Sequence, residues 1–255
     1  MYIGRFAPTP SGPLHFGSVI TAMASYLDAK HNNGKWKVRI DDIDSPRVVE
    51  GAESAILKSL EKLGLFWDNK VSRQSENIKE YKDILEVLKN KNLTYNCRCS
   101  RKKILESNES DSDEPIYKNN CRNKQHPSSK KSSIRLIANY KSINFIDRAQ
   151  GPQFHNIDNT ASDFIIKRSD QLYAYQFAVV IDDELQSVNN IVRGADLLNS
   201  TIKQHCITNI LNFSEKTYMH VPIALINNRK LSKGNGDKLN SNNLSLILVE
   251  GLKFL

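Results

Sequence analysis

The sequence lacks any hydrophobic run long enough to cross a membrane. It also lacks the opening of a secretory signal peptide, because Met1 leads directly into a short apolar segment without a charged start or a cleavage site. Cysteine is scarce, with 4 residues in 255, and three of the four lie between positions 97 and 121. This clustering argues against a disulfide framework and fits a reducing compartment. We therefore expect a cytoplasmic protein that does not associate with membranes.

An excess of acidic residues is also absent. The chain has 36 Lys and Arg against 28 Asp and Glu, which gives a formal net charge of +8 and a pI near 9.2. This balance favours an acidic partner, and nucleic acid is the commonest one. No internal repeat is evident, and the length allows one large domain or one domain that carries an insertion.

A stiff loop near the start, residues 8–18 (PTPSGPLHFGS), precedes a helical pattern of apolar residues. Ser18 is a candidate N-cap for that helix. A helix N-terminus offers free N–H groups to an anion, and Gly12 and Gly17 remove side chains that would block a phosphate. The alternative is a plain turn ahead of a core helix, with His15 an ordinary surface residue. The loop by itself leaves both interpretations open.

The first ninety residues alternate between strand and helix patterns. Residues 2–7 and 35–40 read as strands, and residues 45–64 and 78–90 as amphipathic helices. Ser45 followed by Pro46 is a helix-start signal, and Gly64 is a stop signal. This order is how a doubly wound α/β sheet begins, and such sheets bind ligands at the carboxyl ends of their strands.

The pattern changes near residue 95. Residues 97–133 are polar and poor in periodic apolar positions, so we expect a loop-rich insertion that needs a cross-link to hold its fold. Residues 134–137, 142–146 and 164–167 read as strands of a small subdomain. Residues 173–183 read as an apolar core strand that ends in two carboxylates. The remaining elements are a helix at 199–211 with Cys206 in the core, a strand at 221–226 and a helix at 245–254.

Two short motifs at opposite ends of this pattern carry a family resemblance. Residues 15–18 (HFGS) resemble the HIGH signature of class I aminoacyl-tRNA synthetases, and residues 230–234 (KLSKG) resemble their KMSKS loop. Residues 4–12 (GRFAPTPSG), 38–44 (VRIDDID) and 191–197 (IVRGADL) resemble the glutamyl-tRNA synthetase subfamily over essentially the whole chain.

The resemblance implies a Rossmann-type class I catalytic domain with a zinc-bearing inserted subdomain. The halves of the catalytic domain would be residues 1–94 and 173–255, and the insertion residues 95–172. The chain stops soon after the lysine loop, so we expect no helical anticodon-binding domain. It is therefore similar to short paralogues that activate L-glutamate with ATP and transfer it to queuosine in the anticodon of tRNA(Asp). We expect a monomer.

ATP binding is implied for both motifs. Activation joins a carboxylate to the α-phosphate of ATP, so the site must neutralise anions. The expected catalytic residues are His15, Lys233 and Lys230, and the ATP-binding residues are Pro8, Gly12, His15, Gly17, Ser18 and Lys233. Mg²⁺ would bridge phosphate oxygens, largely through water and ATP itself. The alternative for residues 229–234 is a solvated basic turn.

Glutamate carries two carboxylates and one ammonium group. By resemblance, its pocket comprises Arg5, Phe6, Ala7, Pro8, Thr9, Asp41, Tyr175 and Arg193. Arg5 and Arg193 can bind carboxylates in a bidentate manner. Asp41 stands where the family usually has a glutamate that meets the ammonium, so its shorter side chain requires a closer strand or a bridging water. The alternatives are a helix cap for Asp41 and a surface ion pair for Arg193.

The resemblance also implies a structural zinc ion. Its ligands would be Cys97, Cys99 and Cys121, with Tyr117 as the fourth. Thiolates around tetrahedral Zn²⁺ suit an insertion without its own core. His126 is an alternative to Tyr117, and free structural cysteines are the alternative to a metal site.

Three rival functions remain at this stage. A truncated synthetase would charge the 3′ end of tRNA(Glu), and a non-catalytic paralogue would bind RNA only. The presence of His15, Lys233, Arg5 and Arg193 together counts against the second. A small nucleotidyltransferase with a similar loop would not explain the glutamate-pocket match.

Overall fold

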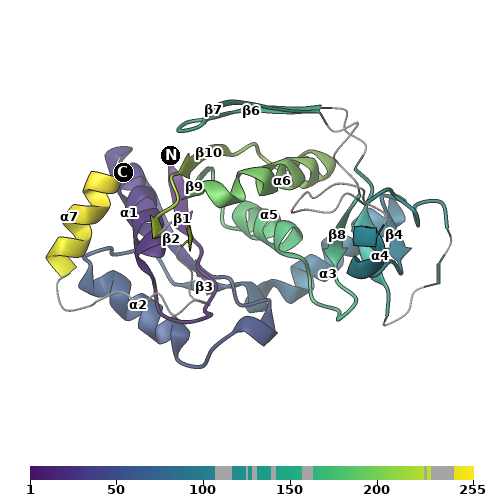
Figure 1. The fold of residues 1–255 in the computed structure, drawn as a ribbon, viewed down its shortest axis with the longest axis horizontal. Coiled ribbons are helices and arrows are strands. Elements are labelled where there is room, and N and C mark those ends of the chain that lie inside the picture. Colours follow the sequence, from purple (N-terminus) through teal and green to yellow (C-terminus); the bar gives the residue numbers. More distant parts are fainter. Residues whose placement is uncertain are drawn as a thin grey trace.

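The computed structural model describes residues 1–106, 117–124, 126–127, 131–138, 142–156, 163–226, 229–230 and 244–255. Within them, the central element is a seven-stranded sheet (Figure 1). Its strands in spatial order are β3 (Ser72–Arg73), β2 (Lys35–Ile40), β1 (Ile3–Phe6), β9 (Asn190–Gly194), β10 (Thr217–Val221), β6 (Ser142–Asp147) and β7 (Gly151–Asn156). Neighbours run parallel except for the antiparallel pair β6–β7. The parallel doubly wound sheet expected from the sequence is confirmed.

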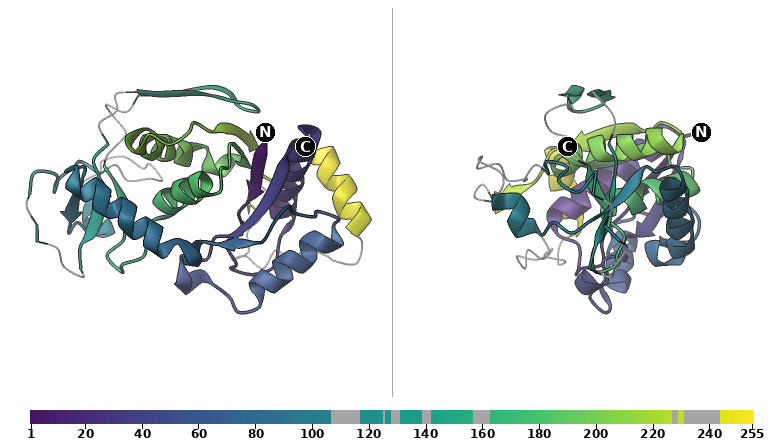
Figure 2. Two further views of the ribbon diagram at one scale, coloured as in Figure 1. Left: turned by 180° about the vertical axis from the view of Figure 1, so that it is seen from behind. Right: turned by 90° about the vertical axis from the view of Figure 1, so that its right-hand side faces the viewer.

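Seven described helices surround this sheet and its insertion. They are α1 (Phe16–His31), α2 (Ala52–Lys62), α3 (Ile78–Asn90), α4 (Arg101–Glu106), α5 (Tyr175–Leu185), α6 (Leu198–Leu211) and α7 (Leu244–Phe254). Short 3₁₀ turns lie at Ser45–Arg47, Gln74–Asn77 and Ala195–Leu197. Helices α1 and α7 lie side by side in both Figure 1 and Figure 2. None of the described helices is both long enough and apolar enough to cross a membrane.

A second, three-stranded sheet comprises β4 (Thr94–Cys97), β5 (Ser133–Leu136) and β8 (Phe164–Lys167), all antiparallel. Together with α4 it lies at the opposite end of the molecule from α7, as Figures 1 and 2 show. A short ladder pairs β11 (Leu225–Ile226) with β12 (Arg229–Lys230). The expectation that residues 142–146 belong to the small subdomain is wrong, because they lie in β6, which pairs with β10 of the main sheet.

The apolar core has two main parts. One gathers α1 and α2 over β1 and β2, with Trp36 fully buried and its indole N–H donated to Ser25 at 2.9 Å. The other gathers α3, α5 and α6, and it includes Cys206 as expected. The second core also contains residues of the small sheet, among them Leu136, Phe164 and Ile166.

Several sequence expectations are confirmed closely. Residues 35–40 form β2, residues 78–90 form α3 and residues 164–167 form β8. The C-terminal helix starts one residue earlier than expected. The glycine stop signal is also confirmed, because Gly64 follows α2 with φ of +71°.

The expectation of a core strand at residues 173–183 is wrong. This segment forms α5, which begins at Tyr175 and buries Phe177, Ile181 and both aspartates. A short apolar run does not distinguish a buried strand from a helix buried on most sides. The helical form places Asp182 and Asp183 next to each other inside the protein, where charged partners surround them.

Other boundaries also differ. Helix α1 begins at Phe16 with His15 as its N-cap, so Ser18 lies inside the helix. Ser45 and Pro46 start only a 3₁₀ turn, and α2 begins after Gly51. Residues 221–226 are not one strand, because β10 ends at Val221 and β11 starts at Leu225. Strand β9 was not expected as a strand, although it carries Arg193.

Candidate active site

A cavity of about 650 Å³ lies at the carboxyl ends of β1 and β9, against the start of α1. In doubly wound sheets this edge, where the strand order reverses, is the usual ligand site. Among the cavity's lining residues are most of those expected to bind ATP or glutamate: Arg5, Phe6, Ala7, Pro8, Thr9, His15, Gly17, Ser18, Tyr175 and Arg193. Gly12 and Asp41 are not among them. One cavity thus contains residues from both predicted sets.

The first wall of the cavity is the start of α1. His15 caps this helix, and its Nδ1 accepts a hydrogen bond from the backbone N–H of Ser18 at 3.3 Å. Gly17 provides the space for this arrangement, since a Cβ there would lie 3.3 Å from both Cε1 and Nδ1 of His15. Gly12 has φ of +138°, a conformation that favours glycine, so its role is in the turn. The helix N-terminus therefore opens into the cavity without a side chain at Gly17.

Arg5 lines the cavity, and Asp183 fixes its guanidinium. Its Nε and Nη2 donate to the two carboxylate oxygens of Asp183 at 3.2 and 3.3 Å. Both side chains are almost fully buried. This pairing makes Arg5 a fixed cation rather than a mobile surface charge, because both donors are committed to one rigid helix.

Arg193 reaches the same cavity from β9. Its Nε donates to Nε2 of His220 at 2.9 Å, and its Nη2 donates to Thr201 Oγ1 at 2.7 Å. Nη1 is buried and has no hydrogen-bond partner among the described residues. A buried guanidinium nitrogen without a partner is costly, so an acceptor such as a carboxylate fits this position. The alternative of a surface ion pair for Arg193 does not apply, since the residue is 3% exposed.

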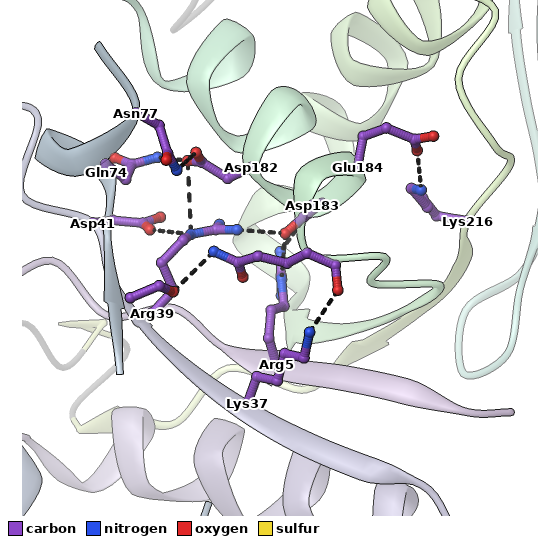
Figure 3. Close-up of polar contacts among 12 residues, drawn as sticks. Arg5, Lys37, Arg39, Asp41, Gln74, Asn77, Asp182, Asp183, Glu184 and Lys216 are labelled. Carbon is purple, nitrogen blue, oxygen red and sulfur yellow. Dashed lines mark hydrogen bonds and ion pairs between the residues drawn. The ribbon is translucent and has the colours of Figure 1, made fainter. Parts of the chain in front are cut away.

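Behind Arg5, a buried cluster joins two arginines to three aspartates (Figure 3). Arg39 donates from Nε to Asp41 at 2.7 Å and from Nη1 to Asp183 at 2.7 Å. Asp182 lies 3.8 Å from the same Nε and accepts hydrogen bonds from Gln74, Asn77 and Tyr81. With every group ionised, the cluster would carry one more negative charge than positive.

The protonation of the cluster follows from burial and from these contacts. Burial raises the pKa of Asp41 to about 6, in spite of the neighbouring Arg39. Burial also opposes ionisation of Asp183, but the cations of Arg5 and Arg39 outweigh it and lower the pKa of Asp183. Burial also raises the pKa of Asp182. Protonation of Asp41 near pH 6, or of Asp182, would therefore remove the excess negative charge.

The predicted helix cap for Asp41 is not what the structure shows. Its carboxylate contacts Arg39, and its backbone N–H donates to the carbonyl of Pro8 at 3.0 Å. This hydrogen bond ties the end of β2 to the loop that borders the cavity. Asp41 thus lies beside the site without lining it.

Two further charged residues line the cavity and were not singled out from the sequence. Asp196 is the one carboxylate among the lining residues, and Arg47 is an exposed cation that contacts Asp44. Asp196 lies within the motif at residues 191–197, so the motif itself was the available signal. Arg47 had no comparable signal beyond its position after a strand.

A group of three thiols lies in the insertion. The Sγ atoms of Cys97, Cys99 and Cys121 are all within 4.8 Å of one another. Tetrahedral Zn²⁺ with Zn–S bonds of about 2.3 Å would place thiolates about 3.8 Å apart, so the group fits such an ion. The hydroxyl of Tyr117 lies 3.4 Å from the Cys97 Sγ. Burial and the neighbouring thiols raise the pKa of Cys99 to about 11, so joint ionisation of the group requires a cation.

Comparison with known proteins identifies the family. Residues 3–246 match the family model for tRNA synthetases class I (E and Q), catalytic domain. The chain is 46% identical over 224 residues to a glutamyl-Q tRNA(Asp) synthetase of Pseudomonas paraeruginosa, which covers 88% of this chain and 74% of the relative. The chain belongs to the class I tRNA synthetases of the E and Q type. The glutamyl-Q tRNA(Asp) synthetase of Pseudomonas fluorescens is similarly close, at 46% over 225 residues, with 87% and 72% covered.

Solved structures agree with this membership of the class I synthetases. A glutamate tRNA ligase from Elizabethkingia meningosepticum in complex with its amino acid superposes with a TM-score of 0.80 at 28% identity. The match covers 94% of this chain and 53% of that one, so the chain spans about half the length of this ligase. An arginyl tRNA synthetase from Campylobacter jejuni, at 12% identity and a TM-score of 0.52, shares the fold alone.

The lysine loop that the synthetase resemblance implied lies mostly outside the described residues. Lys233 is not described. Lys230 is described only through its backbone, which pairs with Leu225 in the β11–β12 ladder. The catalytic roles of both lysines therefore stay predictions.

The two candidates for a fourth metal ligand differ in position. Among the described residues, the group that could hold a metal ion contains the three cysteines but not His126. Tyr117 is buried beside the thiols, and its hydroxyl accepts a hydrogen bond from the backbone N–H of Cys121 at 3.0 Å. The guanidinium of Arg135 lies 3.5 Å from the centre of its ring. These contacts favour Tyr117 over His126.

Proposed function

We propose that the cavity activates L-glutamate with ATP and that the glutamyl group then passes to queuosine in the anticodon of tRNA(Asp). The observation that carries the proposal is the convergence of Arg5 and Arg193 on the cavity that α1 opens into. The family membership and the names of the 46% identical relatives support the same activity. The assignment of queuosine in tRNA(Asp) as the acceptor rests on the names of these relatives.

Amino-acid recognition follows from the charges around the cavity. Arg193 offers a buried Nη1 to the side-chain carboxylate of glutamate, while Arg5 adds positive potential from a position fixed by Asp183. The amide oxygen of glutamine could also accept from Nη1, but it is neutral, so the two arginines favour the charged carboxylate of glutamate. Asp41, Asp182 and Asp183 do not line the cavity, so their excess negative charge would attract the substrate ammonium only from a distance. Any contact between the ammonium and Asp41 would need a bridging water, because Asp41 lies beside the cavity and its side chain is short.

The activation step needs anion stabilisation more than it needs covalent chemistry. An oxygen of the glutamate α-carboxylate attacks the α-phosphorus of ATP, and pyrophosphate leaves. The N–H groups at the start of α1 and the His15 side chain bind phosphate oxygens, and Gly17 lets the phosphate approach the backbone. Lys233 and Lys230 neutralise the growing charge, and Mg²⁺ accompanies ATP. A queuosine hydroxyl then attacks the carbonyl carbon, and AMP leaves.

The zinc ion has a structural role in this proposal. Cys97, Cys99, Cys121 and Tyr117 would hold it, and it would supply the cross-link that joins β4 to the loop around residue 121.

Glutamate-dependent exchange of pyrophosphate into ATP, measured without tRNA, tests the activation step. We expect exchange with glutamate and none above background with glutamine. Arg193→Ala should raise the KM for glutamate by about a hundredfold, the loss expected when a charged hydrogen bond worth up to about 3 kcal/mol is removed. Arg73→Ala removes a partly exposed arginine from a surface ion-pair network and should leave KM unchanged. No exchange with the wild-type protein would refute the activity, and an unchanged KM in Arg193→Ala would remove Arg193 from the pocket.

A further inference from the structure

Three adjacent strands carry a chain of buried hydrogen bonds that ends in the cavity. Arg193 on β9 lies opposite His220 on β10, and Asp147 ends β6. Nδ1 of His220 lies 2.5 Å from Asp147 Oδ2, and Nε2 of His220 accepts from Arg193 Nε at 2.9 Å. The three side chains are between 0 and 3% exposed. None of the sequence motifs includes Asp147 or His220.

The tautomer of His220 follows from its partners. A guanidinium can only donate, so Nε2 must carry the lone pair and the ring proton must be on Nδ1, facing Asp147. Burial and the Arg193 cation both lower the pKa of His220, although Asp147 opposes them. Asp147 itself stays ionised, because hydrogen bonds from His220, Gln150 and Ala149 outweigh burial and lower its pKa. His220 is therefore a neutral acceptor toward Arg193.

These contacts fix the plane of the Arg193 guanidinium. His220 holds Nε, while Thr201 Oγ1 and, at 3.4 Å, the carbonyl of Leu197 hold Nη2. Two of the three nitrogens are thus anchored, and the third, Nη1, is left for a ligand. A guanidinium fixed in this way cannot rotate to suit a different group, so its position favours one acceptor geometry.

We propose that Asp147 and His220 form a positioning pair that presents Arg193 Nη1 to the side-chain carboxylate of the amino-acid substrate. This proposal rests on the proposed activity of the cavity. The pair acts through Arg193 and touches no reacting atom. Loss of the pair lets the guanidinium rotate, which weakens glutamate binding and relaxes the preference for glutamate over glutamine.

Two variants test the hydrogen bond and one tests the tautomer. His220→Leu removes the acceptor, whereas His220→Gln keeps an acceptor oxygen on a side chain of similar length. Asp147→Asn is the sharper change. Its Oδ1 still accepts the backbone N–H groups of Ala149, Gln150 and His220. Its amide, however, donates to Nδ1, which moves the ring proton to Nε2 and removes the acceptor from Arg193.

His205→Leu is the matched control. His205 is half-buried, and its ring packs 5.3 Å from the ring of Tyr218, which stacks 6.0 Å from His220. Its replacement disturbs the same aromatic stack without removing a described hydrogen bond of Arg193.

We expect His220→Leu and Asp147→Asn to raise the KM for glutamate in pyrophosphate exchange about tenfold to a hundredfold, with a smaller change in kcat. Both should lower the ratio of kcat/KM for glutamate to kcat/KM for glutamine. Compared with His220→Leu, His220→Gln should recover most of the lost glutamate binding. His205→Leu should leave KM near the wild-type value. Equal effects in all four variants, or unchanged KM in His220→Leu and Asp147→Asn, would overturn the positioning role. These outcomes are read against an active wild-type protein, so they are distinct from a failure of the proposed activity itself.

Discussion

Arg39 donates from Nη1 to Asp183 at 2.7 Å, and neither side chain is more than 3% exposed. The same Asp183 also holds Arg5, which lines the cavity. One carboxylate on α5 thus links the buried arginine of β2 to the cavity-lining arginine of β1. Arg39 in the buried cluster and Arg5 at the cavity therefore belong to one network of charges.

This network predicts that loss of its central cation, Arg39, strongly destabilises the fold. Arg39→Met leaves Asp41 and Asp182 buried without their ion-pair partner and Asp183 with only Arg5. We expect the free energy of unfolding in urea to fall by about 3–5 kcal/mol. Lys89→Ala breaks an exposed ion pair with Glu86 and should leave it unchanged within error. A loss in Arg39→Met no larger than in Lys89→Ala would show that the cluster does not stabilise the fold.

The spacing of apolar residues along the sequence predicted much of the fold, but it could not predict this network of charges. Strand β2 and helix α3 follow from residue spacing, whereas α5 does not, because its apolar run fits a strand equally well. Asp183 and Arg5 are 178 residues apart, and His220 and Asp147 are 73 residues apart. No local pattern encodes such pairs, so the sequence located the pocket arginines by family motif and missed the residues that hold them.

The pH dependence of stability tests the protonation of Asp41. Its pKa is raised from about 3.9 in the unfolded chain to about 6 in the fold, so ionisation opposes folding. Its contribution is therefore most favourable below about pH 3.9 and is lost as the pH rises through 6. From pH 4.5 to pH 7 we expect the wild-type protein to lose about 1–3 kcal/mol relative to Asp41→Asn, measured by urea unfolding of both. A difference that does not change with pH would mean that Asp41 is already ionised at the lower pH.

A substitution at Gly17 tests the proposed binding of ATP at the start of α1. A methyl group there would lie 3.3 Å from the ring of His15, so Gly17→Ala should displace the ring or block the phosphate. We expect the KM for ATP to rise about tenfold. Thermal stability should not fall, because alanine favours the helix.

Gly51→Ala is the comparison variant, because it should lower stability without weakening ATP binding. Gly51 has φ of +75° and no atom within 4 Å of an added Cβ, so alanine there should cost about 1 kcal/mol of stability. Its KM for ATP should stay unchanged. An unchanged KM in Gly17→Ala would argue against phosphate binding at this helix end.

Metal analysis tests the thiol group. We expect one zinc ion per chain after purification without chelator, and a lower melting temperature after its removal, because the insertion would lose its cross-link. Tyr117→Phe should weaken zinc retention in a chelator competition, and His126→Ala should not. The absence of stoichiometric zinc would contradict the site, and the reverse order of the two variants would make His126 the fourth ligand.

The most direct test of the central claim is transfer of radiolabelled glutamate to purified tRNA. Three acceptors are compared at equal concentration: tRNA(Asp) that carries queuosine, tRNA(Asp) that lacks it, and tRNA(Glu). We expect glutamate to be attached only to the first, through a linkage that does not involve the 3′ end. Attachment to tRNA(Glu) or to tRNA(Asp) without queuosine would contradict the account.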